Sequence, residues 1–401
     1  MCQRLQKIAL SPVTTAAPVK YVPHASERPV TCWRTLVSVV FCLLLLSCTR
    51  VEKLDLSRLR LPPGFRISVF AQAPHARQMA FSPGGVLLVT EMSDGTVLAL
   101  PDAKHTGHAT RTVSVLSGLN GPHGIAFHQG KLYVAEINAV RRYDWDEGQL
   151  LASNGQKIVD IPGSGGGHST RTILFANGKL YLATGSSCNV CVEDDKRRAA
   201  VTEYNEDGSG ARTFASGLRN AVGLTVNPRT NTIWATDNGR DWLGDSLPPE
   251  EVNDLGPNGG NAGWPYCYGN RVPDRSQSKD YDCSKTIAPA VEMQAHSAPL
   301  GLLFYNGEMF PAEYRGSLFV TFHGSWNRSV PTGYKVVCIK FNDKGEPQGP
   351  PEDFISGWLR PGETKKGLWM GRPVGLVVGP EDALYVTDDS AGVVYRVTWE
   401  K

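Results

Sequence analysis

The chain has 401 residues, of which 41% are hydrophobic and 20% charged, a composition typical of a globular protein with a sizeable core. Its 42 glycines and 27 prolines are spread along the sequence, which predicts many turns between short strands rather than disorder. The net charge of +2 gives no basis for a nucleic-acid partner or for electrostatic binding to an acidic membrane surface.

The N-terminal region reads as a targeting segment. Residues 36–46 form an apolar run of about 11 residues, too short to span a bilayer but right for the hydrophobic part of a signal peptide. The run ends in Leu-Leu-Ser-Cys at residues 45–48, which resembles a bacterial lipobox with Cys48 as the acylated first residue of the mature chain. The alternative is an ordinary signal peptide cleaved nearby.

Either alternative predicts an exported protein of the periplasm or cell envelope. Residues 1–48 are then the targeting segment and residues 49–64 a tether. Membrane contact is expected only through a lipid anchor at Cys48.

From residue 65 onward, one hairpin pattern recurs six times. An apolar strand is followed by a turn and by a second strand of alternating polarity. The first three copies are about 45 residues apart, which is the period of a four-stranded propeller blade. One blade cannot bury both faces of its sheet, so we predict an all-β, six-bladed β-propeller over residues 65–401. The copies begin at Met79, Gly124, Thr172, Gly223, Gly301 and Gly375.

The two ends of this region are expected to pair. Residues 65–70 read as a strand that completes the last blade beside residues 393–399. Such pairing joins the ends of the domain and removes an exposed strand edge.

Five cysteines follow Cys48. The Cys188-Asn-Val-Cys191 segment is compatible with half a zinc site, but no second pair of this spacing follows it. In an oxidising compartment a local disulfide is favoured there, and Cys267 and Cys283 are expected to pair as well. Cys338 lies in a strand pattern and is expected to be a buried free thiol.

Active sites of propellers lie on the axis, so the informative loops are those that flank the repeated hairpins. His168 follows the glycine-rich residues 163–167 and directly precedes a strand, where a histidine can act as a general base near neutral pH. Its alternative is an ordinary surface histidine. Arg219, followed by Asn220, also precedes a strand and can neutralise developing negative charge, or else form an inter-blade salt bridge.

Three further segments carry candidate ligands. Residues 237–253 are dense in carboxylates and turns, which suits Ca²⁺, although the spacing is not that of an EF-hand and a solvated loop is the alternative. Residues 322–328 and 370–373 place Arg328 and Arg372 beside strands. Trp326 can stack on a flat ligand or a sugar face, or pack in the core.

Taken in order, these loops resemble the glucose/sorbosone dehydrogenase family, soluble propellers that use pyrroloquinoline quinone (PQQ). The sorbosone dehydrogenase-like branch, related to fungal pyranose dehydrogenases, is the most similar, and the resemblance covers residues 61–399. It is carried by Leu61-Pro-Pro-Gly-Phe65, Gly185-Ser-Ser-Cys-Asn-Val-Cys191, Asn261-Ala-Gly-Trp-Pro-Tyr-Cys267 and His323-Gly-Ser-Trp-Asn-Arg328.

The resemblance implies a PQQ- and Ca²⁺-dependent sugar dehydrogenase. His168 matches the base that takes a proton from the sugar while hydride passes to the quinone, and Arg219 matches the arginine that stabilises charge on the reduced quinone. The resemblance places four further residues at the cofactor, namely Asn220, Trp326, Arg328 and Arg372, and four at the metal, namely the carbonyls of Gly239 and Arg240 with Glu251 and Asn253.

The sequence departs from the glucose-oxidising members at several positions. Gly167 stands where they have an aspartate, Val374 where they have a second arginine, and Arg240 where they have a proline. Their quinone-clamping lysine is matched only by Asn327 or Arg328. These differences bear on substrate identity and PQQ affinity, while the base and the charge-stabilising arginine are present.

Two other classes compete with a dehydrogenase that takes a small sugar and passes electrons to an unidentified acceptor. One is a non-catalytic propeller that binds a sugar or a protein partner. The other is a Ca²⁺-dependent hydrolase such as a lactonase, which needs several carboxylates and an asparagine around an axial metal. The histidine and arginine at the predicted axis suit an anionic tricarboxylate cofactor better, so the dehydrogenase is favoured.

Overall fold

A computed structural model describes residues 54–163, 166–277 and 280–400. Over these residues the chain is almost entirely β, as its short alternating segments predict. The helices among them are three single 3₁₀ turns, Leu56–Arg58, Cys283–Lys285 and Ala312–Tyr314. No described helix has the length and apolarity needed to cross a membrane. Cys48 and the rest of the predicted targeting segment lie outside the described residues.

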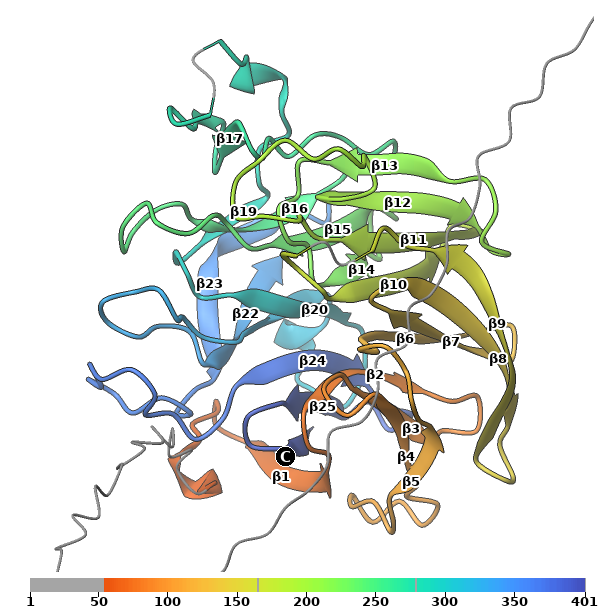
Figure 1. The fold of residues 1–401 in the computed structure, drawn as a ribbon. Helices are drawn as coiled ribbons and strands as arrows, with labels where there is room; N and C mark the ends of the chain where they lie inside the picture. Colours follow the sequence, from red (N-terminus) through yellow and green to blue (C-terminus); the bar gives the residue numbers. More distant parts are fainter. Residues whose placement is uncertain (1–53, 164–165, 278–279, 401) are drawn as a thin grey trace, which may run out of the picture. The chain divides into compact units, whose positions relative to one another are not determined.

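Six four-stranded antiparallel sheets follow one another around a central axis and form a β-propeller (Figure 1). The first strand of each sheet lies innermost and contacts the first strands of both neighbouring sheets. Blade 1 consists of β2 (Ala76–Phe81), β3 (Leu87–Glu91), β4 (Thr96–Leu100) and β5 (Val113–Leu116). Blade 2 consists of β6 (Gly124–His128), β7 (Lys131–Glu136), β8 (Ala139–Asp146) and β9 (Leu151–Asp160). Blade 3 consists of β10 (Arg171–Ala176), β11 (Lys179–Thr184), β12 (Ala200–Asn205) and β13 (Arg212–Ser216).

Blade 4 carries the longest insertion, a loop between its third and fourth strands that contains the small hairpin β17 (Cys267–Tyr268) and β18 (Val272–Pro273). Blade 4 consists of β14 (Leu224–Val226), β15 (Ile233–Asp237), β16 (Glu250–Asp254) and β19 (Val291–Met293). Blade 5 consists of β20 (Pro299–Tyr305), β21 (Ser317–Phe322), β22 (Lys335–Phe341) and β23 (Pro347–Ile355). Blade 6 consists of β24 (Pro373–Val378), β25 (Leu384–Asp388), β26 (Val393–Trp399) and β1 (Phe65–Gln72).

The predicted closing strand is confirmed. β1 pairs antiparallel with β26, with Phe65 opposite Trp399 and Gln72 opposite Val393. The first strand of the domain therefore completes the blade formed by its last three strands. The segment before it also packs on the propeller: Leu59 is buried, and Arg60 exchanges two backbone hydrogen bonds with Ser356. Residues 54–64, which the sequence assigned to a tether, thus include packed structure.

The core consists of layers between neighbouring blades. Leu88 and Val97 of blade 1 pack against Leu132 and Val134 of blade 2, and equivalent apolar clusters fill the other gaps. Alternate residues of each strand point to opposite faces of its sheet, so both faces of a blade become buried only when two neighbours are present. This requirement explains why the hairpin is repeated.

A ring of buried side-chain hydrogen bonds joins each blade to the next near the axis. In four blades the donor is a threonine hydroxyl on the second strand, and in the other two it is His123 or Thr172. Each bond ends on a backbone carbonyl at the start of the next inner strand. The six pairs are Thr90–His123, His123–Arg171, Thr172–Val222, Thr236–Leu300, Thr321–Val374 and Thr387–Arg77.

These bonds require the inner strands to approach closely. Gly301 allows such an approach, because a Cβ atom there would lie 2.6 Å from the carbonyl oxygen of Val374. The Thr321 hydroxyl bridges the same two strands, accepting from the Gly301 amide at 2.9 Å and donating to the Val374 carbonyl at 2.6 Å. The bond therefore satisfies two backbone groups that the sheets leave unpaired.

Replacing Thr321 with valine should lower the free energy of unfolding by about 1–3 kcal/mol, because buried backbone groups lose their partner while the shape is kept. Thr184 is the matched control. It ends the second strand of blade 3, is buried, and its hydroxyl has no partner among the described residues. Thr184→Val should therefore leave stability unchanged or slightly higher. Denaturant unfolding of both variants checks this, and equal losses would contradict the proposed function of the ring.

Candidate active site

The candidate site lies where the inner strands begin. His168 precedes β10, Arg219 and Asn220 precede β14, and Ala298 precedes β20. Loops that follow β15 and β21 reach the same place. Together they enclose a cavity of about 280 Å³, lined by His168, Arg219, Asn220, Asn238, Gly239, Asp241, Glu250, His296, Ala298, Trp326 and Asn327.

The cavity brings together five of the ten site residues predicted from the sequence: His168, Arg219, Asn220, Gly239 and Trp326. The other five, Arg240, Glu251, Asn253, Arg328 and Arg372, do not line it. The structure therefore supports a common site for the predicted base, the predicted charge-stabilising arginine and one predicted metal ligand.

Hydrogen bonds fix the tautomer of His168. Its Nδ1 lies 3.0 Å from the Ser186 hydroxyl and 3.2 Å from the Ser186 carbonyl. The single hydroxyl proton of Ser186 is donated to the Cys188 carbonyl at 2.6 Å, so the hydroxyl can only accept from the imidazole. Nδ1 must therefore carry the proton, and Nε2 keeps its lone pair. No described residue hydrogen-bonds Nε2.

His168 is also held in its neutral form. Burial, followed by the positive charge of Arg219, lowers its pKa to about 4. Ser186 links the two residues directly, since its carbonyl accepts from the His168 amide at 2.9 Å and its own amide donates to the Arg219 carbonyl at 2.8 Å. The cavity thus contains an unprotonated basic nitrogen close to a buried cation.

All five N–H donors of the Arg219 guanidinium are used. Nε donates to the Asn189 carbonyl, Nη1 to the carbonyls of Asn238 and Gly239, and Nη2 to the Asn189 side chain and Asp241, at 2.8–3.1 Å. Asn189 lies inside the Cys188–Cys191 loop. Because every donor has a protein partner, Arg219 acts on the cavity in this arrangement through its charge.

Glu250 is a cavity residue that the sequence analysis missed. Its carboxylate accepts from the Gly239 amide at 2.8 Å and from the Ala298 amide at 3.3 Å, and burial raises its pKa to about 8. Glu251 points to the other face of β16, where its carboxylate accepts from the Asn253 side chain at 3.0 Å. Neighbouring side chains of a strand point to opposite faces, and this is the sequence signal that distinguishes Glu250 from Glu251.

Two of the three remaining metal candidates, Arg240 and Glu251, lie at a second, much smaller hollow of about 20 Å³. Gly239, Arg240 and Glu251 line it together with Asp237 and Asp274. The Arg240 side chain donates to Asp274 at 2.6 Å, so part of the local negative charge is already neutralised. The Asn253 side chain donates to Glu251, which lines this hollow, and Asn253 does not line the cavity of His168.

Arg328 and Arg372 brace loops. Arg328 donates to the Asp245 carbonyl at 2.7 Å, and Arg372 donates to the carbonyls of His323 and Gly324 at 3.0 and 2.8 Å. The Arg372 guanidinium also lies over the Trp369 ring, with its central carbon 5.4 Å from the ring centroid. These contacts stabilise the segments on either side of the cavity.

A second buried charge cluster adjoins Arg372 and was not predicted. Asp389 accepts from Arg77 at 2.6 Å and from His323 Nε2 at 2.9 Å. The interactions with His323 and Arg77 outweigh the burial penalty and lower the pKa of Asp389, whereas burial lowers that of His323 to about 4. Asp389 therefore joins Arg77 and His323 in one hydrogen-bonded group next to Arg372.

Both predicted disulfides are confirmed, Cys188–Cys191 and Cys267–Cys283, and Cys338 is a buried free thiol as predicted. Because Cys188 and Cys191 are bonded to each other, they are not thiolate ligands for zinc. The first disulfide closes the loop that positions Asn189 against Arg219.

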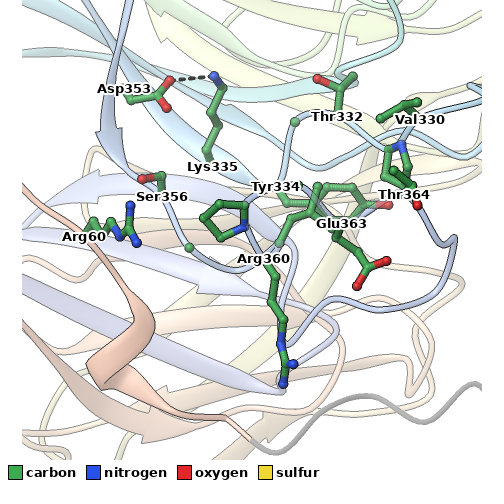
Figure 2. A pocket seen from close by; sticks show the side chains of 16 residues that line it. Arg60, Val330, Thr332, Tyr334, Lys335, Asp353, Ser356, Arg360, Glu363 and Thr364 are labelled. Atoms are coloured by element: carbon green, nitrogen blue, oxygen red, sulfur yellow. Dashed lines mark hydrogen bonds and ion pairs between the residues drawn. The ribbon is translucent and has the colours of Figure 1, made fainter.

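A larger hollow, of about 410 Å³, lies at a different place, between residues 330–335 and 353–364 with Arg60 at one side (Figure 2). An ion pair between Lys335 and Asp353, 2.5 Å apart, lies at its edge. None of the ten predicted site residues lines it, so size alone does not identify the active site.

Comparison with known proteins identifies the family to which the chain belongs. The sequence profile of the TrAA12-like family matches residues 59–400, and the chain belongs to that family. An uncharacterised protein of Borreliella burgdorferi is 29% identical over 391 residues, covering 91% of this chain and 97% of that protein.

One further relative has a name that describes an activity, and the structure of one of its domains has been solved. The PQQ-dependent pyranose dehydrogenase of Coprinopsis cinerea is 26% identical over 83% of this chain, which spans about half (54%) of the fungal protein. The holo form of its PQQ domain superposes with a TM-score of 0.72 at 25% identity, covering 85% of this chain and 97% of that domain.

Replacing Ser186 with alanine should shift the tautomer of His168. Losing one neutral hydrogen bond, about 1 kcal/mol, moves the ratio roughly fivefold toward the form protonated on Nε2. Nitrogen-15 NMR of the His168 imidazole measures this ratio. Ser187→Ala is the control, because the Ser187 hydroxyl bonds Glu193 at 2.8 Å and not the imidazole. An unchanged ratio in Ser186→Ala would show that the backbone carbonyl alone fixes the tautomer.

Proposed function

We propose that this protein is a PQQ-dependent sugar dehydrogenase in which His168 is the general base. The observation that carries the proposal is the neutral imidazole of His168, protonated on Nδ1 by its contact with Ser186, in one cavity with the buried cation Arg219. The name of the Coprinopsis relative and that of its PQQ domain support the same reaction class.

The cavity fits a flat anionic cofactor. Arg219 supplies a buried positive charge, and the Trp326 indole supplies a planar apolar wall. PQQ is a planar tricarboxylate, and when bound it supplies the acceptor for the hydride from the sugar. Arg328 and Arg372 are proposed to act indirectly, through the loops that they brace, because neither lines the cavity.

Calcium is part of the proposal, with ligands that differ from those first expected. Several oxygen-bearing residues line the cavity of His168, among them Asn220, Gly239 and Glu250. Asn220 Oδ1 is buried and has no partner among the described residues. Oxygen donors of this kind are those that Ca²⁺ prefers. We therefore propose Glu250 and Asn220 in place of Glu251 and Asn253.

Three residues of the chain have separate functions in the proposed reaction. His168 Nε2 accepts the proton from the hydroxyl group on the sugar carbon that is oxidised. Ser186 keeps the imidazole in the tautomer that can accept it. The charge of Arg219 stabilises negative charge that develops in the cavity, where a low dielectric strengthens the interaction.

A Ca²⁺-dependent hydrolase is the second candidate. Glu250, Asn220 and Asn238 line the same cavity, and such a group of a carboxylate and two amides is what an axial metal of a hydrolase requires. The dehydrogenase is preferred because the Arg219 guanidinium, which pairs with Asp241 at 3.1 Å, lies in this cavity beside the predicted base His168. Parallel assays with aldoses and lactones separate the two.

Purified protein reconstituted with PQQ and Ca²⁺ should oxidise aldoses in the presence of a dye acceptor. His168→Ala should still bind PQQ, measured by equilibrium dialysis, and turn over about 10²- to 10⁴-fold more slowly, as expected for loss of a general base. His105→Ala is the control, because that side chain is 67% exposed and pairs with Glu381. Full turnover by His168→Ala would contradict the mechanism, and lack of PQQ binding by the wild type would contradict the cofactor.

We also propose that the protein is exported and acylated at Cys48, on the basis of the Leu-Leu-Ser-Cys sequence that ends the apolar run. Cys48→Ser should move the protein from the membrane fraction to the soluble fraction on fractionation, because one lost lipid anchor removes the membrane contact. A variant that stays in the membrane fraction would show that another segment anchors the chain.

A further inference from the structure

Two tryptophans are exposed next to each other at the mouth of the candidate site. The relative exposure of Trp242 is 69% and that of Trp326 is 59%, and among the described residues they are the only large aromatic side chains exposed to this degree. Their ring centroids are 5.5 Å apart and their planes are nearly perpendicular, at 88°. Two adjacent exposed indoles form an apolar surface that is unusual for a surface loop.

Hydrogen bonds between the neighbouring residues hold this pair in place. Asp241, which precedes Trp242, accepts from the side chain of Asn327, which follows Trp326, at 2.7 Å. The other carboxylate oxygen of Asp241 binds the Arg219 guanidinium at 3.1 Å. The two tryptophans are therefore attached to the same network that orients the charged group of the cavity.

The backbone of Trp242 supports a role beyond packing. Its φ of +71° lies in the left-handed region, which is unfavourable for a bulky side chain. A non-glycine residue kept there, with its ring exposed and not buried, is the kind of local strain found at ligand-binding sites. Packing does not explain the residue, because most of the indole contacts solvent.

The cavity size and the ring angle together indicate the ligand. A volume of about 280 Å³ is slightly below the range for small-molecule sites, roughly 300–1,000 Å³. One flat cofactor fills most of it, so a sugar undergoing oxidation must reach into the mouth. Trp326 lines the cavity and Trp242 does not. Two perpendicular indoles cannot both stack on one flat ring, so Trp242 can stack on a second ring.

We propose that Trp242 stacks on the sugar ring next to the one that is oxidised, which makes reducing disaccharides or longer oligosaccharides the preferred substrates. This inference rests on the proposed sugar dehydrogenase function. Pyranose rings present an apolar C–H face that packs on an indole, and the surface near Trp242 needs no charge complementarity for a neutral sugar.

The test compares glucose with maltose and cellobiose, which carry the same reducing-end sugar with one additional ring. In the PQQ-loaded enzyme, Trp242→Ala should raise KM for the disaccharides roughly three- to tenfold, the range for one lost aromatic contact, and leave kcat and the KM for glucose within about twofold. Trp242→Phe should keep part of the effect. Val192→Ala is the control, since it removes another exposed apolar side chain (66%), which directly follows the Cys188–Cys191 loop.

Calorimetric titration of the quinone-free protein with the same disaccharides gives a readout that does not depend on turnover. The wild type should bind maltose or cellobiose more tightly than glucose, and Trp242→Ala should lose that difference. A wild type without this preference, or a Trp242→Ala variant that keeps it or that loses glucose and disaccharides equally, would overturn the inference. A wild type that binds disaccharides but oxidises no sugar with PQQ would instead overturn the proposed function.

Discussion

The hydrogen bond from one blade to the first strand of the next is the constraint on which the rest of the structure depends. It occurs at all six junctions, and each bond provides a partner for a backbone carbonyl at the start of the next inner strand. Because it fixes where each inner strand begins, it also fixes where the preceding loops meet. Thr172 makes one of these bonds only four residues after His168, so the base is attached directly to the ring.

The site shows a division between residues that face the cavity and residues that orient them. Ser186 determines which imidazole nitrogen carries the proton, and Asn189 accepts hydrogen bonds from Nε and Nη2 of Arg219. Both orienting residues come from the segment after β11, and the Cys188–Cys191 disulfide shortens that segment to a tight loop. The chemistry of the cavity is thus prepared before a ligand arrives, which is how protein sites reduce the cost of reorganisation during a reaction.

Much of this architecture was predictable because it is periodic. The two-residue alternation and the blade-length repeat determine the number of blades, the closing strand and the positions of His168, Arg219 and Asn220 before inner strands. The contacts that complete the site have no period. Ser186 and Asn189 act across loops that are distant in sequence, and Glu250 differs from Glu251 by a single step along β16, which reverses the face to which a side chain points. Resemblance to a family alone does not decide which of two neighbouring glutamates faces the cavity.

The pairing of β1 with β26 has a consequence for how the protein is made. The strand that begins at Phe65 finds its partner only after the chain has been synthesised to Trp399, so the ring closes last. Contacts this distant in sequence are slow to form, and until then blade 6 has an open strand edge that can pair with other chains. A nascent chain that lacks its final blade cannot protect its first strand. The pairing of β1 with β26 removes an exposed strand edge from the finished protein, and its absence makes unfinished chains prone to aggregation.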